Sequence, residues 1–424
     1  MNNLYHDEVS PIAKASRMQP RSILLLMVLS VAACGGGGGG GSSGMSAPPP
    51  PVGHSIADLK TMQQLASTVA PNGDANPYGL ATPPAGYTST SVLQPGDILI
   101  SNFSDSTGAI AGKTIMRYVP SSGQMTLFYT NKVGSGPVAL AIGPTGFTWI
   151  ANYQLGYINL ADGATTGDGN EIIVAPDGSD LSANTGIIDN NSGATFDPSQ
   201  ATFSGPWGQV LAQPAGTAAT YFFTSEVNTG WVQRQEIAVP LSATHLVTIG
   251  QLPVGNNAFD PTGPQGMAYD AQRDILYVAS TASNAIVAFV GASTATASFS
   301  SGTVVFSGMP LNAPVGLALN PTNGDLIAVN QLDNNMAEIA PNPSTATPGG
   351  GGGGGYSPMG MAASTVTTFS GKLIATKTLD TTSVDAQAGT GSALFGVLAV
   401  KDSGNNLLVY YTNSNTNTLN VLKQ

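Results

Sequence analysis

The residues Pro264-Gln265-Gly266-Met267-Ala268-Tyr269-Asp270, followed by Ile275-Leu276-Tyr277-Val278-Ala279-Ser280, decide the fold. Both runs are short, rich in apolar residues and separated by turn formers, which is typical of two paired antiparallel strands. The first run recurs with variation at residues 136–141, 205–208, 313–318 and 393–398, and a second apolar run follows each copy. This self-similarity indicates a domain built from repeated small sheets.

A sixth copy is expected at the front of the domain. Residues 97–102 look like the second strand of such a pair, although no first strand is clearly patterned before them. Six copies predict an all-β domain over residues 93–424, a β-propeller of six blades, with seven blades as the alternative. Two long spacings in the repeat, at residues 161–204 and 341–391, are predicted surface excursions.

One end of the predicted channel collects two sets of side chains, because the first strand of a blade starts where its antiparallel neighbour ends. The residues that follow the proline or its equivalent are Val138, Trp207, Gln265, Val315 and Phe395. The residues at the ends of the second strands are Asn102, Asn152, Glu226, Thr281, Asn330 and Asn413.

Six of these residues are the candidate ligand-binding set, and no catalytic residue is assigned: Trp207, Gln265, Phe395, Asn152, Glu226 and Asn330. If the channel is open there, they form an amide and aromatic funnel suited to a neutral glycan or an apolar peptide segment. In the alternative interpretation, the asparagines form turns and the aromatic rings plug the channel.

The copy at residues 264–280, with Asn284, Ile286 and Phe289 after it, resembles the NHL repeat of six-bladed propellers. The resemblance extends over residues 93–424. It implies a central position at which lactonases and related propeller hydrolases hold a divalent cation with carboxylate and amide groups. This chain departs from that pattern, because Glu226 is the only charged residue of the two sets.

The N-terminus has the order of a secretory signal, with basic residues, an apolar run over residues 23–31 and small residues before Cys34. Val31-Ala32-Ala33-Cys34 resembles the bacterial lipoprotein box. The resemblance implies that residues 1–33 are a signal peptide and that Cys34 is lipidated, with palmitate among its acyl chains, and anchors the chain to a membrane. Gly35, where aspartate would signal inner-membrane retention, implies the outer membrane. Translation starts at Met1 or at Met18.

Residues 34–54 are rich in glycine and proline and are predicted to form a flexible tether. Ser55 then offers an N-cap with Asp58 three residues later. Apolar residues after this cap recur at helical spacing, at Ile56, Leu59, Met62, Leu65 and Val69. They predict a short amphipathic helix over residues 55–70, docked on the propeller.

The composition excludes several classes of function. Charged residues make up only 9% of the chain, the formal net charge is −11, and no lysine or arginine occurs between Lys132 and Arg234. A nucleic-acid backbone would find no basic stripe there. The chain has one cysteine and three histidines. It therefore cannot form an internal disulfide, a haem attachment motif or a multi-cysteine zinc site. A chain with so few ionisable groups should also tolerate acid.

The first predicted excursion is acidic, with Asp162, Asp168, Glu171, Asp177, Asp180, Asp189 and Asp197. A calcium site that includes Asp168, Asp177 and Asp180 is one interpretation. Asp-Gly turns on a solvated loop are the other, because the spacing matches neither the EF-hand nor the nonapeptide calcium repeat. We therefore expect no cofactor, with Ca²⁺ as the alternative.

Two functions are consistent with these observations. The expected channel face lacks converging titratable groups, which favours a non-catalytic cell-envelope lipoprotein that uses its propeller as a binding or assembly platform for an envelope protein or a neutral glycan. The alternative is a divalent-cation-dependent propeller hydrolase or lyase, similar to a lactonase, acting around Glu226, Asn152 and Asn330. A sealed channel would weigh against this alternative.

Overall fold

The computed structural model describes residues 54–132, 134–154, 169–179, 187–188, 203–238, 242–257, 259, 261–346 and 366–424. This part of the chain is all-β. Six sheets of four strands form blades 1 to 6, and two small two-stranded sheets and two 3₁₀ turns accompany them. None of its helices is long and apolar enough to span a bilayer.

Blades 1 to 3 follow one another along the chain. Blade 1 contains β2 (Ala75–Ala81), β3 (Ile98–Ser104), β4 (Thr114–Val119) and β5 (Gln124–Thr130). Blade 2 contains β6 (Ser135–Ile142), β7 (Thr148–Gln154), β8 (Asn170–Val174) and β9 (Ile187–Ile188). Blade 3 contains β10 (Pro206–Ala212), β11 (Tyr221–Glu226), β12 (Trp231–Ala238) and β13 (Ser242–Gln251).

Blades 4 and 5 continue the series, and blade 6 combines both ends of the described chain. Blade 4 contains β16 (Pro264–Asp270), β17 (Ile275–Ser280), β18 (Ala285–Val290) and β19 (Thr303–Ser307). Blade 5 contains β20 (Pro314–Leu319), β21 (Leu326–Asn330), β22 (Asn335–Ala340) and β25 (Lys372–Thr378). Blade 6 contains β26 (Leu394–Lys401), β27 (Leu407–Asn413), β28 (Thr418–Lys423) and β1 (Thr61–Ser67).

Smaller elements lie between or beside the blades. They are η1 (Ile56–Asp58), η3 (Thr281–Ser283), the pair β14 (Gly255–Asn256) and β15 (Pro261–Thr262), and the pair β23 (Pro343–Ala346) and β24 (Val366–Phe369). The two long spacings of the sequence therefore contain blade strands, because β8 and β25 fall inside them. Residues 161–168, 180–186, 189–202 and 347–365 of these spacings lie outside the described residues.

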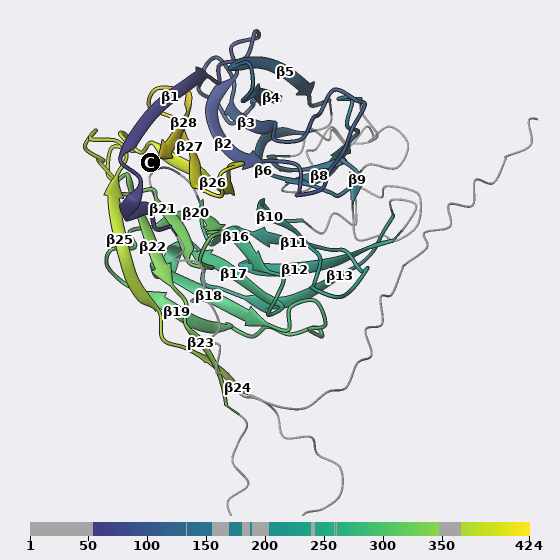
Figure 1. Ribbon diagram of the computed structural model, residues 1–424, viewed down its shortest axis with the longest axis vertical. Coiled ribbons are helices and arrows are strands. Elements are labelled where there is room, and N and C mark those ends of the chain that lie inside the picture. The colour runs from purple at the N-terminus through teal and green to yellow at the C-terminus, as the bar shows by residue number, and fades with distance from the viewer. Residues whose placement is uncertain are drawn as a thin grey trace, which may run out of the picture. The chain divides into compact units, whose positions relative to one another are not determined.

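The six innermost strands surround one axis (Figure 1). β2 contacts β6, β6 contacts β10, and the contacts continue through β16, β20 and β26 back to β2. The ring therefore closes with six blades, which confirms the predicted all-β propeller and excludes the seven-bladed alternative. Such closure is how a propeller removes the open edges of its inner strands.

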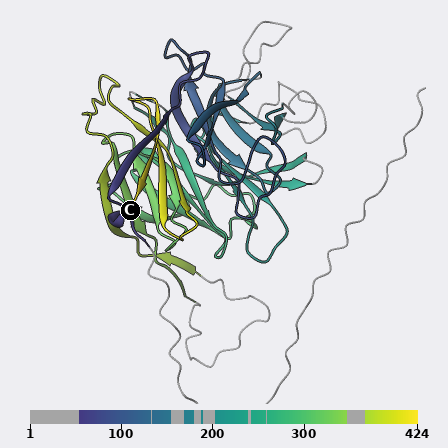
Figure 2. The ribbon, with the colours of Figure 1, turned by 45° about the horizontal axis from the view of Figure 1, so that its top comes forward.

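Blade 6 closes the ring by pairing the beginning of the described chain with its end. β1 runs antiparallel to β28, from Thr61 opposite Lys423 to Ser67 opposite Thr418. Figure 2 shows the same pairing from a second direction, with the N-terminal strand in purple beside the C-terminal strands in yellow. The outermost strand of the last blade is thus supplied by the N-terminal segment, and the sheet holds the two ends together.

The helix predicted over residues 55–70 is wrong. The capping box exists, since Ser55 and Asp58 make both of its bonds, but it caps only the single turn η1. Beyond it, Met62 is 54% and Val69 is 44% exposed, while Leu59 is buried, so the residues of the predicted stripe do not share one buried face. The free edge of β28 offers backbone hydrogen bonds to an extended chain, and this tertiary contact overrides the helical spacing.

Blade 1 also starts earlier than predicted, at Ala75 rather than near residue 93. Its inner strand β2 holds Pro77-Tyr78-Gly79-Leu80-Ala81, which has the same pattern as the Pro-x-Gly copies in the other blades. The sequence signal was present and was missed. Together with β1, it moves the start of the propeller to Thr61.

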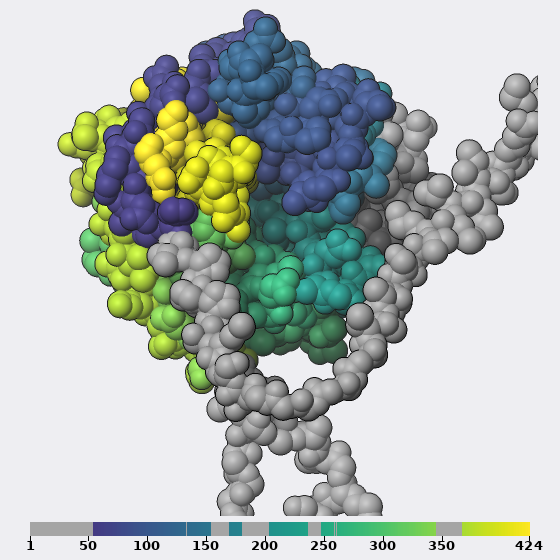
Figure 3. All heavy atoms as spheres, viewed as in Figure 1, coloured from purple at the N-terminus to yellow at the C-terminus, as the bar shows by residue number. Residues whose placement is uncertain are grey.

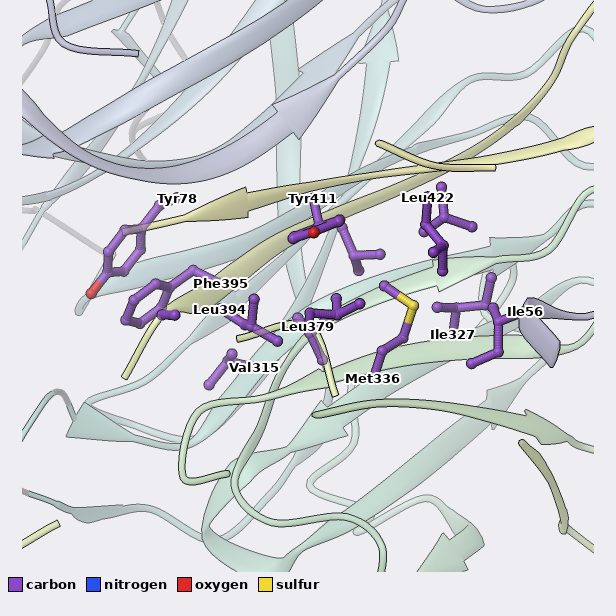
Figure 4. Packing of buried hydrophobic residues seen from close by; sticks show 14 of the residues in the cluster. Ile56, Tyr78, Val315, Ile327, Met336, Leu379, Leu394, Phe395, Tyr411 and Leu422 are labelled. Atoms are coloured by element: carbon purple, nitrogen blue, oxygen red, sulfur yellow. The ribbon is translucent and has the colours of Figure 1, made fainter. Parts of the chain in front are cut away.

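A buried carboxylate fastens the N-terminal segment to blade 5. Glu338 accepts hydrogen bonds from the Ser55 hydroxyl, from the Ile56 N–H at 2.8 Å and from Asn320 Nδ2 at 2.8 Å. The Ile56 side chain joins the apolar core between blades 5 and 6, beside Ile327 and Met336 (Figure 4). The first described residues are therefore held by hydrogen bonds and apolar packing, next to the turn that follows β20.

Inner strands approach one another so closely that glycine is required in most blades. A Cβ atom on Gly208 would lie 1.8 Å from the carbonyl oxygen of Gln265, and one on Gly396 would lie 2.0 Å from the carbonyl oxygen of Tyr78. Both positions follow the residue after the proline or its equivalent. Backbone packing around the axis explains the recurring Pro-x-Gly pattern, because a side chain at these glycine positions would push the blades apart.

Candidate functional site at the two ends of the central channel

The strand register brings together the two predicted sets of side chains at one end of the channel. In five blades, the proline that opens the inner strand pairs with the last residues of the second strand: Pro77 with Asn102, Pro137 with Asn152, Pro206 with Glu226, Pro264 with Ser280, and Pro314 with Asn330. In blade 6, Leu394 pairs with Asn413. One position shifts, since Ser280 and not Thr281 ends β17.

Aromatic rings fill this end of the channel. Tyr78 stacks on Phe395 with ring centroids 3.9 Å apart and on Phe103 with centroids 4.3 Å apart, and Trp207 lies 5.7 Å from the Phe103 ring. Tyr78 and Trp207 are each 3% exposed, and Phe395 is 8% exposed. Figure 4 shows the Tyr78 and Phe395 rings face to face. We call this cluster the aromatic plug: Tyr78, Phe103, Trp207 and Phe395.

The amide side chains around the aromatic plug are buried and donate hydrogen bonds to other amides or to backbone carbonyls. Asn152 accepts a hydrogen bond from Asn131 Nδ2 at 2.7 Å and donates one to Asn170 Oδ1 at 2.8 Å. Asn330 Nδ2 donates to the Pro310 carbonyl at 2.7 Å, and Gln265 Nε2 donates to the Pro261 carbonyl at 2.9 Å. These bonds join strand ends to neighbouring loops, so the asparagines have the structural role of the alternative interpretation.

Glu226, the one charged residue of the predicted set, is 0% exposed. Its Oε2 accepts a hydrogen bond from the Thr229 hydroxyl at 2.7 Å, while its Oε1 has no partner among the described residues. Burial raises the pKa of Glu226 to about 8, because the charged form loses its hydration. The group is therefore largely protonated near neutral pH and lies out of reach of solvent.

A second buried carboxyl group, Glu171 in β8, was assigned from sequence to a surface excursion. It is 0% exposed and accepts hydrogen bonds from the Thr224 hydroxyl and from Gln209 Nε2, the latter at 3.0 Å. Burial raises the pKa of Glu171 to about 7. The signal that could have found it is local: Glu171 is the single acidic residue in the strand Asn170-Glu171-Ile172-Ile173-Val174.

The proposed calcium ligands are only partly described. Asp168 and Asp180 lie outside the described residues, as does Cys34. Asp177 is exposed, and its Oδ1 accepts the Ser179 N–H at 2.8 Å, which is a turn contact. Within the described ranges, no three His, Cys, Asp or Glu side chains are grouped so that they could hold a metal ion. The calcium site stays a prediction.

The opposite end of the channel is open. Beneath the aromatic plug lies a cavity of about 100 Å³, and a wider cavity of about 320 Å³ follows it at the ends of the inner strands. The two share one residue from each blade, which we call the waist: Leu80, Leu140, Gln209, Met267, Leu317 and Val397. Figure 3 shows the hollow at the centre of this face. Sequence analysis did not single out the waist.

Comparisons with known proteins found solved structures that are similar to this chain in fold. No family model matches the chain, and no curated protein matches it. A gluconolactonase from Xanthomonas campestris is 12% identical with a TM-score of 0.48, over 89% of this chain and 95% of that one. An oxidoreductase (glucose dehydrogenase) from Thermus thermophilus is 13% identical with a TM-score of 0.45, over 85% of this chain and 99% of that one.

A chain of a nidogen–laminin complex is 14% identical with a TM-score of 0.42, over 63% of this chain and 76% of that chain. These three structures include enzymes and a binding complex. Likenesses at this level carry no functional argument. The assignment to the six-bladed β-propellers rests on the six sheets of the chain itself.

Proposed function

We propose that the protein is a non-catalytic bacterial envelope lipoprotein, anchored at the outer membrane through Cys34, whose propeller serves as a binding or assembly platform. The closure of one channel end carries the proposal. Glu226 is 0% exposed, and Trp207, which follows the strand partner of Glu226 in the chain, is 3% exposed within the aromatic plug. Because no ligand from solvent reaches that carboxyl group, recognition at the propeller surface is the function that the geometry supports best.

The first described residue of the chain is bound at one end of the channel. The His54 carbonyl accepts hydrogen bonds from Asn320 Nδ2 at 2.8 Å and from the Thr322 hydroxyl at 3.0 Å. Both residues belong to the turn between β20 and β21, at the open end of the channel. We infer that the aromatic-plug face, at the opposite end of the channel, is the surface that meets an envelope protein or a neutral glycan.

The anchor is tested by changing Cys34 to Ser. We expect the parent chain to incorporate labelled palmitate and to fractionate with outer membranes, and the C34S chain to lose the label and to leave the membrane fraction. Membrane attachment that survives the substitution would contradict the anchor.

The platform is tested by site-specific photo-crosslinking in cells. Met309 is 76% exposed in the connection between β19 and β20, on the aromatic-plug face, and Asn323 is exposed on the opposite face. We expect a crosslinker at position 309 to give a discrete adduct that the same group at position 323 does not give. No adduct at 309, or the same adduct at both positions, would count against the platform.

The hydrolase alternative is tested by calcium and magnesium titrations of the thermal melt. A cation that binds only the folded state must raise the melting temperature. We expect neither ion to raise it by more than about 1 °C at millimolar concentration, since 1 kcal/mol corresponds to about 2–4 °C in larger domains. A clear rise that is lost in Glu226→Gln would favour the hydrolase.

A further inference from the structure

The joint between blades 2 and 3 differs from the other five joints of the ring. Among the described residues, each of the other joints is filled by a cluster of at least eight buried apolar residues. The cluster between blades 2 and 3 has five: Ala141, Trp149, Ile173, Phe203 and Phe222. Because apolar burial is the main force that holds neighbouring blades together, this joint gains the least from it.

Polar side chains take the place of apolar ones in this joint. Glu171 of blade 2 accepts hydrogen bonds from the Thr224 hydroxyl in β11 and from Gln209 Nε2 in β10, the latter at 3.0 Å. Gln235 Nε2 in β12 also donates to it, at 3.3 Å. Gln233 lies opposite Thr224 in the register of β11 and β12, so it faces the same joint. One carboxyl group of blade 2 is thus enclosed by four polar side chains of blade 3.

Several buried polar atoms of the joint have no hydrogen-bond partner. Among the described residues, these are the Oε1 atoms of Gln209, Gln233 and Gln235 and, on the side of blade 2, Nε1 of Trp149. Buried polar groups are rarely left unpaired in native proteins. Water hydrates these atoms when the two blade faces separate, so separation costs less here than at an apolar joint.

The charge on Glu171 adds to this difference. Burial raises the pKa of Glu171 to about 7, and the pKa of the neighbouring Glu226 is raised to about 8, mainly by burial and also by the charge on Glu171. Within the described ranges, neither glutamate takes part in a salt bridge. Arg234 of β12 instead donates to the carbonyls of Ala292 and Ser293 in blade 4. A carboxylate in this joint is therefore uncompensated until water reaches it.

We propose that the propeller ring opens locally between blades 2 and 3, that loss of a proton from the enclosed carboxyl group favours the open form, and that the other five joints stay closed. Opening uncovers Gln209, which belongs to the waist, so the joint controls access to the channel from the side. This conformational device does not rest on the platform function, since a chain without any envelope partner would still open at this joint.

Buried cysteines report the opening. In the full chain carrying Cys34→Ser, Ala151→Cys places the only thiol in the joint, because Ala151 is the strand partner of Glu171. Ala279→Cys is the matched control in blade 4, where it faces the joint with blade 5. Each alanine precedes the residue that pairs with the opening proline of its blade, and each is 0% exposed.

The rate of thiol modification by a maleimide is measured for both chains between pH 6 and pH 8. The ratio of the Ala151→Cys rate to the Ala279→Cys rate removes the pH dependence of the thiol itself. We expect this ratio to rise about tenfold, because the open form binds fewer protons than the closed form. Glu171→Gln should remove most of the rise, since the amide has no proton to lose. Glu338→Gln, in the buried carboxyl group of blade 5, should leave it unchanged.

Hydrogen exchange followed by mass spectrometry tests the same joint without a cysteine in it. In the chain carrying only Cys34→Ser, β8 and β18 are compared, because they are the third strands of blades 2 and 4. After correction for the chemical exchange rate, we expect exchange in β8 to accelerate between pH 6 and pH 8 relative to exchange in β18. This measurement decides the result if the Ala151→Cys chain melts below the Cys34→Ser chain.

Three results would overturn the proposal. The first is a modification ratio that does not change with pH. The second is a rise that persists when Glu171→Gln and Glu226→Gln are combined. The third is an equal acceleration of exchange in β8 and β18, which would mean that the whole ring loosens rather than one joint. None of these results bears on the adduct expected at position 309, so the two proposals fail separately.

Discussion

At the scale of single residues, Glu171 and Glu226 stand out among the described carboxyl groups, because both are fully buried and both have strongly raised pKa values. Burial raises the pKa of Glu171 to about 7 and of Glu226 to about 8, and the charge on Glu171 adds to the second shift. Between pH 4.5, the usual value for glutamate, and pH 8, the folded chain therefore binds more protons than the unfolded chain. Its stability must fall as pH rises through this interval.

The pH dependence of unfolding tests this conclusion. We expect urea unfolding to show highest stability near pH 5 and a loss of several kcal/mol by pH 9, because each pKa unit corresponds to about 1.4 kcal/mol and the pKa values of both glutamates lie well above the usual 4.5. Glu226→Gln should flatten the decline, because a neutral amide replaces the titrating group. Asp177→Asn, on the surface, should leave it unchanged. Stability that rises between pH 5 and pH 9 would be incompatible with two buried, protonated glutamates.

At the scale of elements, the inner strands were predictable and the closing strand was not. The Pro-x-Gly pattern can be recognised locally, because glycine occurs at a fixed place in the strand where the backbone of the next blade leaves no room for a side chain, as at Gly208 and Gly396. The strand β1 has no such signal. Gln63 and Gln64 favour no strand, and only the unpaired edge of β28, distant in sequence, makes the segment extended.

Alanine at Gly208 should strain the ring. Its Cβ would lie 1.8 Å from the Gln265 carbonyl oxygen, so blades 3 and 4 would have to separate. We expect Gly208→Ala to lose about 1–3 kcal/mol of unfolding free energy, the usual cost of overpacking. Blade 2 has alanine at the equivalent position, Ala139, so Ala139→Gly is the matched control and should cost less than about 1 kcal/mol. Equal stability of Gly208→Ala and the parent would disprove the steric requirement.

Removal of β1 should leave blade 6 with three strands and destabilise it. A chain that begins at residue 68 exposes the backbone edge of β28 and loses the Glu338 contacts with Ser55 and Ile56. We expect its melting temperature to fall by about 10 °C or more relative to a chain that begins at residue 54, because several kcal/mol of pairing and burial disappear. A peptide of residues 54–67 added in trans should restore part of the loss. Identical melting temperatures would show that blade 6 closes without β1.

At the scale of the whole molecule, the channel is closed at one end and open at the other. The sequence placed Trp207, Phe395, Asn152 and Glu226 correctly at one end, but their role depended on whether side chains from different blades meet on the axis, as the four rings of the aromatic plug do. No local pattern encodes that meeting, because it follows from ring closure and from side-chain volume. The open end was missed for the same reason, since its wall is ordinary apolar strand residues.

The accessibility of Trp207 tests the closure of the channel most directly. In a chain carrying Trp149→Phe and Trp231→Phe, Trp207 is the only remaining tryptophan, and its fluorescence reports on the aromatic plug alone. At 3% exposure its emission should be blue-shifted, and acrylamide should quench it only weakly in the folded chain and strongly after unfolding in urea. Strong quenching in the folded chain would mean that the channel end is open and that Glu226 is within reach of a ligand.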